Sequence, residues 1–342
     1  MAHDPAPQVL RKKELGTMKA FFRKSLILSG AVAAMALLAA CASTQPAAPA
    51  AQQPRPDESN KPADTAQTAG YARPELLVEA AWLATNLNDP KLRILDVRAA
   101  DKYQQGHIPG AINLNSNQLD QKYGEVQDVA PTEKVAEVLG NLGVGSDSKV
   151  VIYDDASTLS AGRVFWVMDY YSHPSLAILN GGYAKWDIEK REITRQATKI
   201  EPAKFIAKAD ASKRADAAYV KANLGKSSVS LCDVRTPDEY TGKDVRAKRG
   251  GAIPGAVNVD WANNVTTGDT PQVKLAADLK KLYTEAGVTP EKEVITYCQT
   301  GVRAAQSYYT LKLLGYTNVR NYDGSWQEWG NDASLPLEKK GS

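Results

Sequence analysis

Three blocks of this 342-residue sequence occur twice, in the same order along the chain. The first block, ILDVRAADKYQQGHIPGAINL (94–114), returns as LCDVRTPDEYTGKDVRAKRGGAIPGAVNV (231–259). The second, VVIYDDASTLSAGRVFW (150–166), returns as VITYCQTGVRAAQSYY (294–309). The third, LNGGYAKW (179–186), returns as YDGSWQEW (322–329). The offset is 137 residues at Asp-Val-Arg and 144 at the position after the second block's apolar run. Because blocks that recur in order indicate a repeated unit, we expect two domains of one fold, at 71–200 and 201–342.

Short β-branched runs alternate with helical patterns in each copy. Residues 149–153 (KVVIY) and 293–297 (EVITY) are apolar over most of their length, as parallel strands covered on both faces are. Helical spacing predicts helices at Leu76–Leu87, Thr132–Leu142 and Gly162–Tyr171, and another that begins at about Val302. The predicted fold class is therefore α/β, with a mainly parallel central sheet flanked by helices in each domain.

The charge balance bears on the kind of partner that the chain binds. A hydrophobic fraction of 43% and a charged fraction of 24% are those of a globular protein. The formal charge is +3, but the first forty residues hold six Lys/Arg and two Asp/Glu, so the remainder carries −1. Nothing in this balance indicates nucleic acid as a partner.

The N-terminal residues have the pattern of a targeting signal. From Met18, MKAFFRKSLILSGAVAAMALLAAC places a basic stretch before an uncharged apolar run, Ser25 to Ala40. That run is shorter than the about 20 apolar residues of a membrane span. LAAC at 38–41 resembles a bacterial lipobox, which implies a signal peptide at 18–40, cleavage before Cys41 and a lipid on that cysteine. The alternative is an ordinary secretory signal in which Cys41 is incidental.

The segments on either side of this signal are interpreted differently. Residues 1–17 are taken as an upstream extension. Residues 41–70 are rich in Ala, Pro and Gln and almost lack large apolar groups, so we expect a disordered tether. Ala42, rather than Asp, favours sorting to an outer membrane. The expected localisation is export and lipid anchoring through Cys41 to a bacterial membrane, the outer membrane, with the folded part in the periplasm.

A cysteine stands where the apolar run 293–297 ends and a helical pattern begins. In CQTGVR, Gly301 allows tight curvature, so the amide N–H groups of the loop can converge on the Cys298 sulfur at the start of a helix. This setting favours thiolate over thiol, and Arg303 adds positive charge on the first helical turn. Cys298 is therefore the candidate nucleophile. The alternative is a buried strand-end thiol, which is how we interpret Cys232 in SVSLCDVR.

These motifs resemble a known family. Asp-Val-Arg followed by Ile-Pro-Gly-Ala, then strand-cysteine-loop-helix, then Asp-Gly-Ser-Trp resembles a tandem rhodanese, a two-domain sulfurtransferase, over about residues 71–342. The resemblance implies a catalytic C-terminal domain and a degenerate N-terminal one, in which Asp154 stands where Cys298 stands. It also implies a sulfur donor, typically thiosulfate, a persulfide on Cys298, and cyanide or a thiol as acceptor. His107 is expected to be structural.

The resemblance assigns further residues to the site. The active-site loop comprises Gln299, Thr300, Gly301, Val302 and Arg303. Glu239 occupies the place where many relatives carry a substrate-binding arginine, so we expect the basic segment KDVRAKRGG to compensate. The candidates for substrate binding in it are Arg249, Lys248 and Arg246. Arg235 is expected to brace the loop through Asp233.

Other activities stay open. Gln299-Thr300 matches neither the basic residues of thiosulfate-preferring relatives nor the Gly-Ser-Gly of mercaptopyruvate-preferring ones, and Thr300 keeps a hydroxyl, so 3-mercaptopyruvate is an alternative donor. A non-turnover sulfur carrier or sulfide-handling protein would use the same cysteine. A cysteine phosphatase is disfavoured, because its loop holds one residue more between cysteine and arginine. The sequence shows no metal cluster or nucleotide-binding loop, so neither metal nor cofactor is expected.

Overall fold

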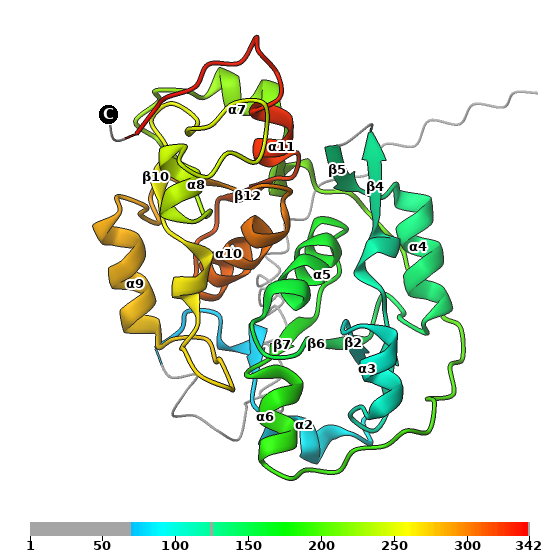
Figure 1. Cartoon of the computed structure of the whole chain (residues 1–342). Coiled ribbons are helices and arrows are strands. Elements are labelled where there is room, and N and C mark those ends of the chain that lie inside the picture. The colour runs from blue at the N-terminus through cyan, green and yellow to red at the C-terminus, as the bar shows by residue number, and fades with distance from the viewer. Residues whose placement is uncertain (1–69, 124–125, 341–342) are drawn as a thin grey trace, which may run out of the picture. The chain divides into compact units, whose positions relative to one another are not determined.

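The computed structural model of the chain describes residues 70–123 and 126–340. The predicted signal peptide, Cys41 and residues 42–69 of the predicted tether lie outside them. Within them the chain builds two five-stranded sheets, one from each sequence copy (Figure 1). The elements from η2 to α6 are called the N-terminal half below, and those from η4 to α11 the C-terminal half.

The first sheet has the strand order β1-β7-β6-β2-β3. All its strand pairs are parallel, and β4 and β5 form a separate antiparallel pair. The elements of this half are η2 (Pro74–Leu76), β1 (Leu77–Val78), α2 (Ala80–Asn86), β2 (Leu92–Asp96), α3 (Ala100–Gln105), β3 (Ala111–Asn113), η3 (Ser116–Leu119), β4 (Asp120–Tyr123), β5 (Val126–Val129), α4 (Thr132–Asn141), β6 (Lys149–Tyr153), α5 (Leu159–Tyr170), β7 (Leu176–Leu179) and α6 (Gly182–Ile188).

The second sheet repeats this order as β10-β9-β11-β12-β8, again with parallel pairs. Strand β11 takes the central place that β6 takes in the first sheet. The elements of this half are η4 (Ala211–Lys213), β8 (Arg214–Ala215), α7 (Ala217–Ala222), β9 (Val229–Asp233), α8 (Pro237–Thr241), β10 (Val257–Asn258), η5 (Trp261–Asn264), α9 (Ala276–Glu285), β11 (Glu293–Tyr297), α10 (Val302–Leu313), β12 (Val319–Tyr322) and α11 (Ser325–Trp329). The predicted α/β fold with two parallel sheets is confirmed.

The two central strands have the predicted bounds and burial. In β6 and in β11 the first residue is partly exposed and the next four are buried. Both strands have a neighbour on each side and are covered by helices, which is why their sequences are apolar without alternation. Their carboxyl ends lead directly into the loops before α5 and α10.

One predicted helix begins too early. Helical spacing predicted Leu76–Leu87, but α2 starts at Ala80, because Leu77 and Val78 pair with β7 as the edge strand β1. The pairing buries both side chains against the sheet, and this outweighs local helical preference. Helix α4 ends one residue before its predicted end, α5 starts three residues before its predicted start, and α10 begins at Val302, as predicted.

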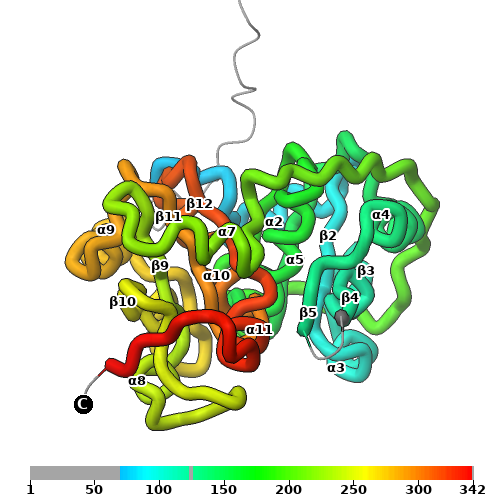
Figure 2. The backbone as a smooth tube through the Cα atoms, turned by 90° about the horizontal axis from the view of Figure 1, so that it is seen from above, coloured from blue at the N-terminus to red at the C-terminus, as the bar shows by residue number. Residues whose placement is uncertain are grey.

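Helices α5 and α10 pack against each other between the two sheets (Figures 1 and 2). The crossing is tight at Gly162, where a Cβ atom would come within 2.7 Å of Gln306 Cα. Phe165 and Tyr309 meet edge to face, with ring centroids 4.9 Å apart. One hydrophobic cluster runs through both helices and onto a face of each sheet. The two halves therefore share a core.

The connection between α6 and α7 stays on the N-terminal half for most of its length (Figure 2). Thr194 forms an antiparallel bridge with His107, the Ala203 amide donates to Gly140 O, and the Asp210 amide donates to Tyr170 O. The Phe205 side chain is buried there. The predicted division at 200/201 falls inside this connection.

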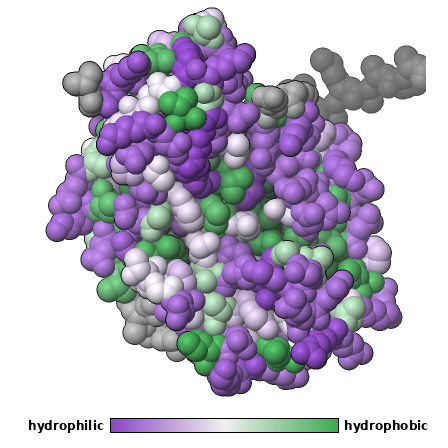
Figure 3. Space-filling model, viewed as in Figure 1, coloured by the Kyte–Doolittle hydropathy of each residue, from purple (hydrophilic) through white to green (hydrophobic). Residues whose placement is uncertain are grey.

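The face in Figure 3 is mostly hydrophilic, and hydrophobic side chains are scattered over it, some of them near its middle. Across 70–123 and 126–340, the helices are too short or too polar to cross a membrane. Nor do the His, Cys, Asp and Glu side chains of those residues form a group of three that could hold a metal ion.

Candidate active site

Cys298 follows the last residue of β11, at the carboxyl end of the central strand. Ligands of open parallel sheets bind at this edge. The loop turns at Gly301, which has a φ of 78° and immediately precedes α10. A Cβ atom there would come 2.4 Å from Asp323 Oδ1 and 2.6 Å from Asp323 O. Only glycine therefore fits the turn that directs the helix start toward Cys298.

Hydrogen bonds from the first turn of α11 support the Cys298 loop. Ser325 Oγ accepts a hydrogen bond from the Cys298 amide at 3.1 Å and donates to Tyr322 O at 2.7 Å. The Trp326 amide donates to Cys298 O, and the Gln327 amide to the next carbonyl, each at 2.9 Å. The sequence indicated this contact only as a recurring block, and assigned Ser325 no role.

The N-terminal half repeats these contacts at Asp154. The amides of Tyr183 and Ala184 donate to the carbonyls of Asp154 and Asp155 at 2.9 and 2.8 Å. Thr158 takes the place of Gly301 before the helix, with a φ of 59°. The two loops therefore share their support, but they differ in the residue at the strand exit and in length, since four residues separate Asp154 from α5 and three separate Cys298 from α10.

The Asp154 carboxylate shows what such a loop surrounds. Its oxygens accept hydrogen bonds from the amides of Thr158, Ser160 and Ala161, at 3.2, 3.0 and 3.3 Å. Burial raises the pKa of Asp154 to about 6, although these three N–H groups lower it. The loop is thus an anion-binding nest filled by the protein's own carboxylate.

Arg303 lies on the first turn of α10 and is paired with Glu239. Its Nη1 and Nη2 donate to the two carboxylate oxygens at 2.6 and 2.8 Å. Glu239 is fully buried and also closes a capping box with Thr236 at the start of α8. Burial lowers the pKa of Arg303, while its bonds to Glu239 and the neighbouring Cys298 raise it above the usual range. The charge predicted to act on Cys298 is therefore shared with a carboxylate.

The three predicted substrate-binding residues lie in different settings. Arg249 directs its guanidinium to main-chain carbonyls, those of Trp329, Gly330, Asp332 and Leu335. Lys248 is exposed. Arg246 borders the Cys298 loop, because its carbonyl accepts from Gln299 Nε2 at 2.9 Å, and its guanidinium lies 2.7 Å from Asp244 and 3.8 Å from Glu239. Their roles toward a substrate stay predictions, and the donors of Arg249 are already used.

Arg235 pairs with Asp233, the partner predicted for it. Its Nε donates to Asp233 Oδ1 at 2.9 Å, and its Nη2 donates to Gly251 O at 2.8 Å. The guanidinium also lies over the Trp326 ring, 4.4 Å from the centroid. Trp326 in turn bonds the Cys298 carbonyl. Arg235 therefore connects the carboxyl end of β9 to Gly251 and to the segment that supports Cys298.

Access to the sulfur is narrow. Cys298 is 1% exposed. The Gln299 side chain reaches from the loop to Arg246 O and to Gln327 Oε1, at 2.9 and 3.2 Å. Cys232 is fully buried in β9, and burial, together with Asp233, raises the pKa of its thiol far above the usual range. A reagent therefore reaches Cys298 only when the side chains around it move.

A model of the rhodanese-like domain matches this sequence twice, at residues 79–189 and 216–332. The chain belongs to the rhodanese family. Its two matched regions make it a tandem rhodanese, and they contain the two equivalent loops, with Asp154 in the first and Cys298 in the second.

Curated relatives of this rhodanese align over nearly their full length. It is 38% identical to the sulfur carrier protein TtuD of Thermus thermophilus, covering 79% of this chain and 99% of the relative. It is 36% identical to a thiosulfate sulfurtransferase of Corynebacterium glutamicum, covering 78% and 92%. It is 34% identical to a thiosulfate sulfurtransferase of Azotobacter vinelandii, covering 78% and 98%.

Solved structures share the fold of this rhodanese at lower identity. A complex of EanB carrying a cysteine persulfide with ergothioneine has a TM-score of 0.73 at 23% identity, covering 80% of this chain and 72% of that one. The structure of YnjE has a TM-score of 0.68 at 23% identity, covering 79% and 70%.

His107 is packed as a structural residue of the rhodanese fold. Its two ring nitrogens lie 2.8 Å from Tyr103 O and 3.2 Å from Gln196 O. The ring stacks on Tyr103 with centroids 3.7 Å apart. These contacts agree with the structural role expected for it.

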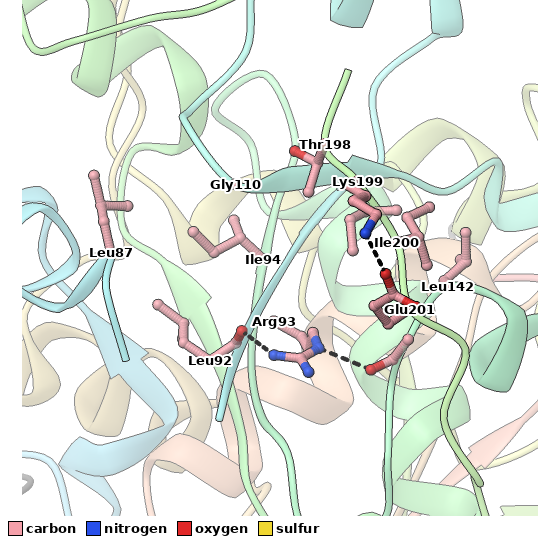
Figure 4. Close-up of a pocket in the computed structure, with 12 residues that line it drawn as sticks. Leu87, Leu92, Arg93, Ile94, Gly110, Leu142, Thr198, Lys199, Ile200 and Glu201 are labelled. Carbon is pink, nitrogen blue, oxygen red and sulfur yellow. Dashed lines mark hydrogen bonds and ion pairs between the residues drawn. The ribbon is translucent and has the colours of Figure 1, made fainter. Parts of the chain in front are cut away.

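A cavity of about 230 Å³ opens in the N-terminal half of the rhodanese (Figure 4). Apolar side chains of β2, β3 and α4's C-terminal end line it, together with residues 198–201 of the connection. The Arg93 guanidinium in its wall donates to the carbonyls of Leu92 and Gly143, and Lys199 pairs with Glu201. Its charged groups thus already have partners within the chain.

Proposed function

We propose that this protein is a thiosulfate sulfurtransferase that moves a sulfane sulfur through a persulfide on Cys298. Family membership and the names of its curated relatives support the reaction type. The observation that carries the proposal is the pair of equivalent loops. In the first, three amide N–H groups surround the Asp154 carboxylate, and in the second Cys298 stands at the same strand exit, with a helix N-terminus after it.

The two half-reactions are balanced without a cofactor. The Cys298 thiolate forms a bond to the outer sulfur of thiosulfate, the sulfur–sulfur bond of thiosulfate breaks, and its electron pair leaves with sulfite. The carbon of cyanide, or the sulfur of a thiolate acceptor, then bonds to the terminal persulfide sulfur. The persulfide bond breaks and its electron pair returns to the Cys298 thiolate. Loop N–H groups stabilise the negative charge in both states.

The donor is the finer part of the proposal. Next to Cys298, Arg303 and Arg246 provide positive charge, but Glu239 and Asp244 accept from them. The net positive charge next to Cys298 is therefore smaller than the basic sequence of residues 243–251 led us to expect. Thr300 offers a hydroxyl that suits a carboxylate, so 3-mercaptopyruvate is the alternative donor. The rate at which the protein converts cyanide to thiocyanate, measured with each donor at equal concentration, decides between them.

A sulfur carrier is the second candidate function. A relative with 38% identity bears that name, and Cys298 is 1% exposed, which suits a persulfide that is shielded until a partner opens the site. Turnover separates the two functions. Many thiocyanate molecules formed per protein support the enzyme, whereas one sulfur equivalent transferred without cycling supports the carrier.

The central test replaces the nucleophile. Cys298→Ser should abolish thiocyanate formation and remove the mass increment of one sulfur atom that thiosulfate adds to the Cys298 peptide, because serine cannot form a persulfide. Cys232→Ser is the matched control, a second buried cysteine outside the loop, and should keep both. Activity retained by Cys298→Ser would place the nucleophile elsewhere. Phosphate released from an aryl phosphate, without thiocyanate, would favour the phosphatase.

We further propose export and a lipid anchor on Cys41, on the basis of the sequence alone. Cells grown with a radioactive fatty acid should label the protein, and Cys41→Ala should lose the label and release the protein from the membrane fraction. A label that persists in the variant, or an unlabelled membrane-free protein, would favour the ordinary secretory signal.

A further inference from the structure

Asp323 places a buried carboxylate against the Cys298 loop. It lies between β12 and α11 and is fully buried. Its Oδ1 occupies the space a side chain at Gly301 would need, since a Cβ there would come within 2.4 Å of it. Asn321, two residues earlier, donates to Gly301 O at 3.2 Å. An unpaired negative charge at this position would oppose a thiolate or persulfide on the neighbouring sulfur.

The counter-charge for Asp323 comes from the other half of the molecule. Arg163 of α5 is 2% exposed and directs both Nη atoms to the Asp323 carboxylate. Its Nε and Nη2 also donate to Asp120 Oδ1 at 3.1 and 2.6 Å. Burial lowers the pKa of Arg163, but the two carboxylates outweigh this and raise it beyond its usual range. The guanidinium is therefore charged at every working pH.

Further charged groups face this cluster. Asp128 of β5 and Arg214 of β8 form an ion pair at 2.8 Å. Burial raises the pKa of Asp128 to about 6, opposed by Arg214 and reinforced by Asp323. On the opposite side of the loop lie the pairs Arg303–Glu239 and Arg235–Asp233. Arg163 is thus the cation that contacts Asp323, and it is shared with Asp120, while Asp128, which also faces Asp323, is paired with Arg214.

The N-terminal half provides an internal comparison. Asn180 occupies the position of Asp323 in the first copy, as the blocks LNGGYAKW and YDGSWQEW show. Asn180 Oδ1 accepts from the Val273 amide of the other half at 3.0 Å, and its Nδ2 donates to Glu79 Oε1 at 2.7 Å. Both copies therefore reach across the boundary at this position. In the copy with Cys298 this contact is the ion pair of Asp323 with Arg163, whereas in the copy with Asp154 it is a neutral hydrogen bond to Asn180.

We propose that Arg163, supplied by the half without a nucleophile, is a positioning residue for Cys298: it neutralises Asp323 and leaves the loop N–H groups free to favour an anionic sulfur. The proposal rests on the function assigned to Cys298 above. It gives the N-terminal half an electrostatic part in the reaction, without contact between Arg163 and substrate.

A charge cycle tests the proposal in the full chain. The measurement is the rate at which iodoacetamide alkylates the Cys298 peptide, followed by mass spectrometry from pH 5 to 10, so that Cys41 and Cys232 do not contribute. Arg163→Met should move the midpoint of this profile upward by about one pH unit, with an about tenfold slower rate below the midpoint. Asp323→Asn should move it downward. The double variant should lie closer to the wild-type midpoint than Arg163→Met does, although Asp120 then still lacks Arg163.

The cycle separates electrostatics from mere packing. A purely structural role of Arg163 predicts that the double variant is no closer to wild type than Arg163→Met. If Arg163→Met does not fold, Asp323→Asn carries the test alone, because asparagine fits the equivalent position in the first copy. An unchanged or upward midpoint in Asp323→Asn overturns the proposal. Wild-type protein that alkylates at Cys298 but forms no persulfide would refute the proposed function and leave the cycle valid.

Discussion

Glu239 is a buried acid whose charge depends on one partner. Burial raises the pKa of this carboxyl, but the hydrogen bonds and charge of Arg303 outweigh burial and lower it to about 2. A carboxyl with a depressed pKa in the folded state stabilises the fold above its unfolded pKa, and the contribution is lost as the pH falls through the folded value. The relevant window therefore runs from about pH 4.5 down to about pH 2.

Glu239→Gln should accordingly change the acid sensitivity of the fold. Between pH 6 and pH 3, the free energy of unfolding of the wild type should fall by about 2 kcal/mol more than that of the variant, because glutamine does not titrate. Urea unfolding at both pH values measures this. Asp238→Asn, on the same helix but exposed, is the control and should follow the wild type. Parallel pH dependence of wild type and Glu239→Gln would contradict the assignment.

Local sequence was informative about Cys298 and less so about its neighbours. The strand exit, the glycine turn and the helix start are consecutive in the chain, so a single stretch predicted them. Glu239 meets Arg303 across 64 residues, and Ser325 meets Cys298 across 27. The role predicted for Arg249 toward a substrate stays a prediction, but the sequence did not indicate that its donors reach the carbonyls at and after the end of α11. Such partners depend on tertiary packing, which the order of residues in one sequence does not reveal.

At the level of elements, the loop between β11 and α10 depends on close backbone approach. Gly301→Ala should lower the free energy of unfolding by at least about 2 kcal/mol and abolish sulfur transfer, because the new Cβ atom overlaps Asp323 in addition to the strain of a positive φ. Urea unfolding and thiocyanate formation are the measurements.

Gly255→Ala separates the two contributions. Gly255 has a φ of 77°, nearly that of Gly301, but a Cβ atom there would meet nothing within 4 Å. It should cost only the backbone strain, about 1 kcal/mol, and keep activity. Equal effects of the two substitutions would mean that contact with Asp323 is unimportant.

The elements themselves were largely predictable where one periodicity dominated. The apolar β6 and β11 and the start of α10 agree with the structure. The two-residue strand β1 was not recognised, because its apolar residues also fit the helical spacing of α2 and only pairing with β7 distinguishes the alternatives.

The whole molecule should unfold as one unit, since α5 and α10 lie in one hydrophobic cluster that both halves share. Gly162→Ala should destabilise both halves together by about 1–3 kcal/mol, although alanine normally favours a helix, because its Cβ atom would lie 2.7 Å from Gln306 Cα. Coincident urea transitions by circular dichroism and tryptophan fluorescence measure this. Ser160→Ala on the same helix should stay within about 0.5 kcal/mol of wild type. Two separate transitions would contradict the shared core.

The carboxylate of Asp154 has a consequence for the folding of the first copy, because it satisfies the amides of its own loop. Without an anion between them, these amide N–H groups would be buried without hydrogen-bond partners, which costs folding free energy. Here the Asp154 carboxylate accepts hydrogen bonds from the amides of Thr158, Ser160 and Ala161, so these donors are satisfied by the chain itself. The folding of this loop therefore does not require a bound anion from outside the chain.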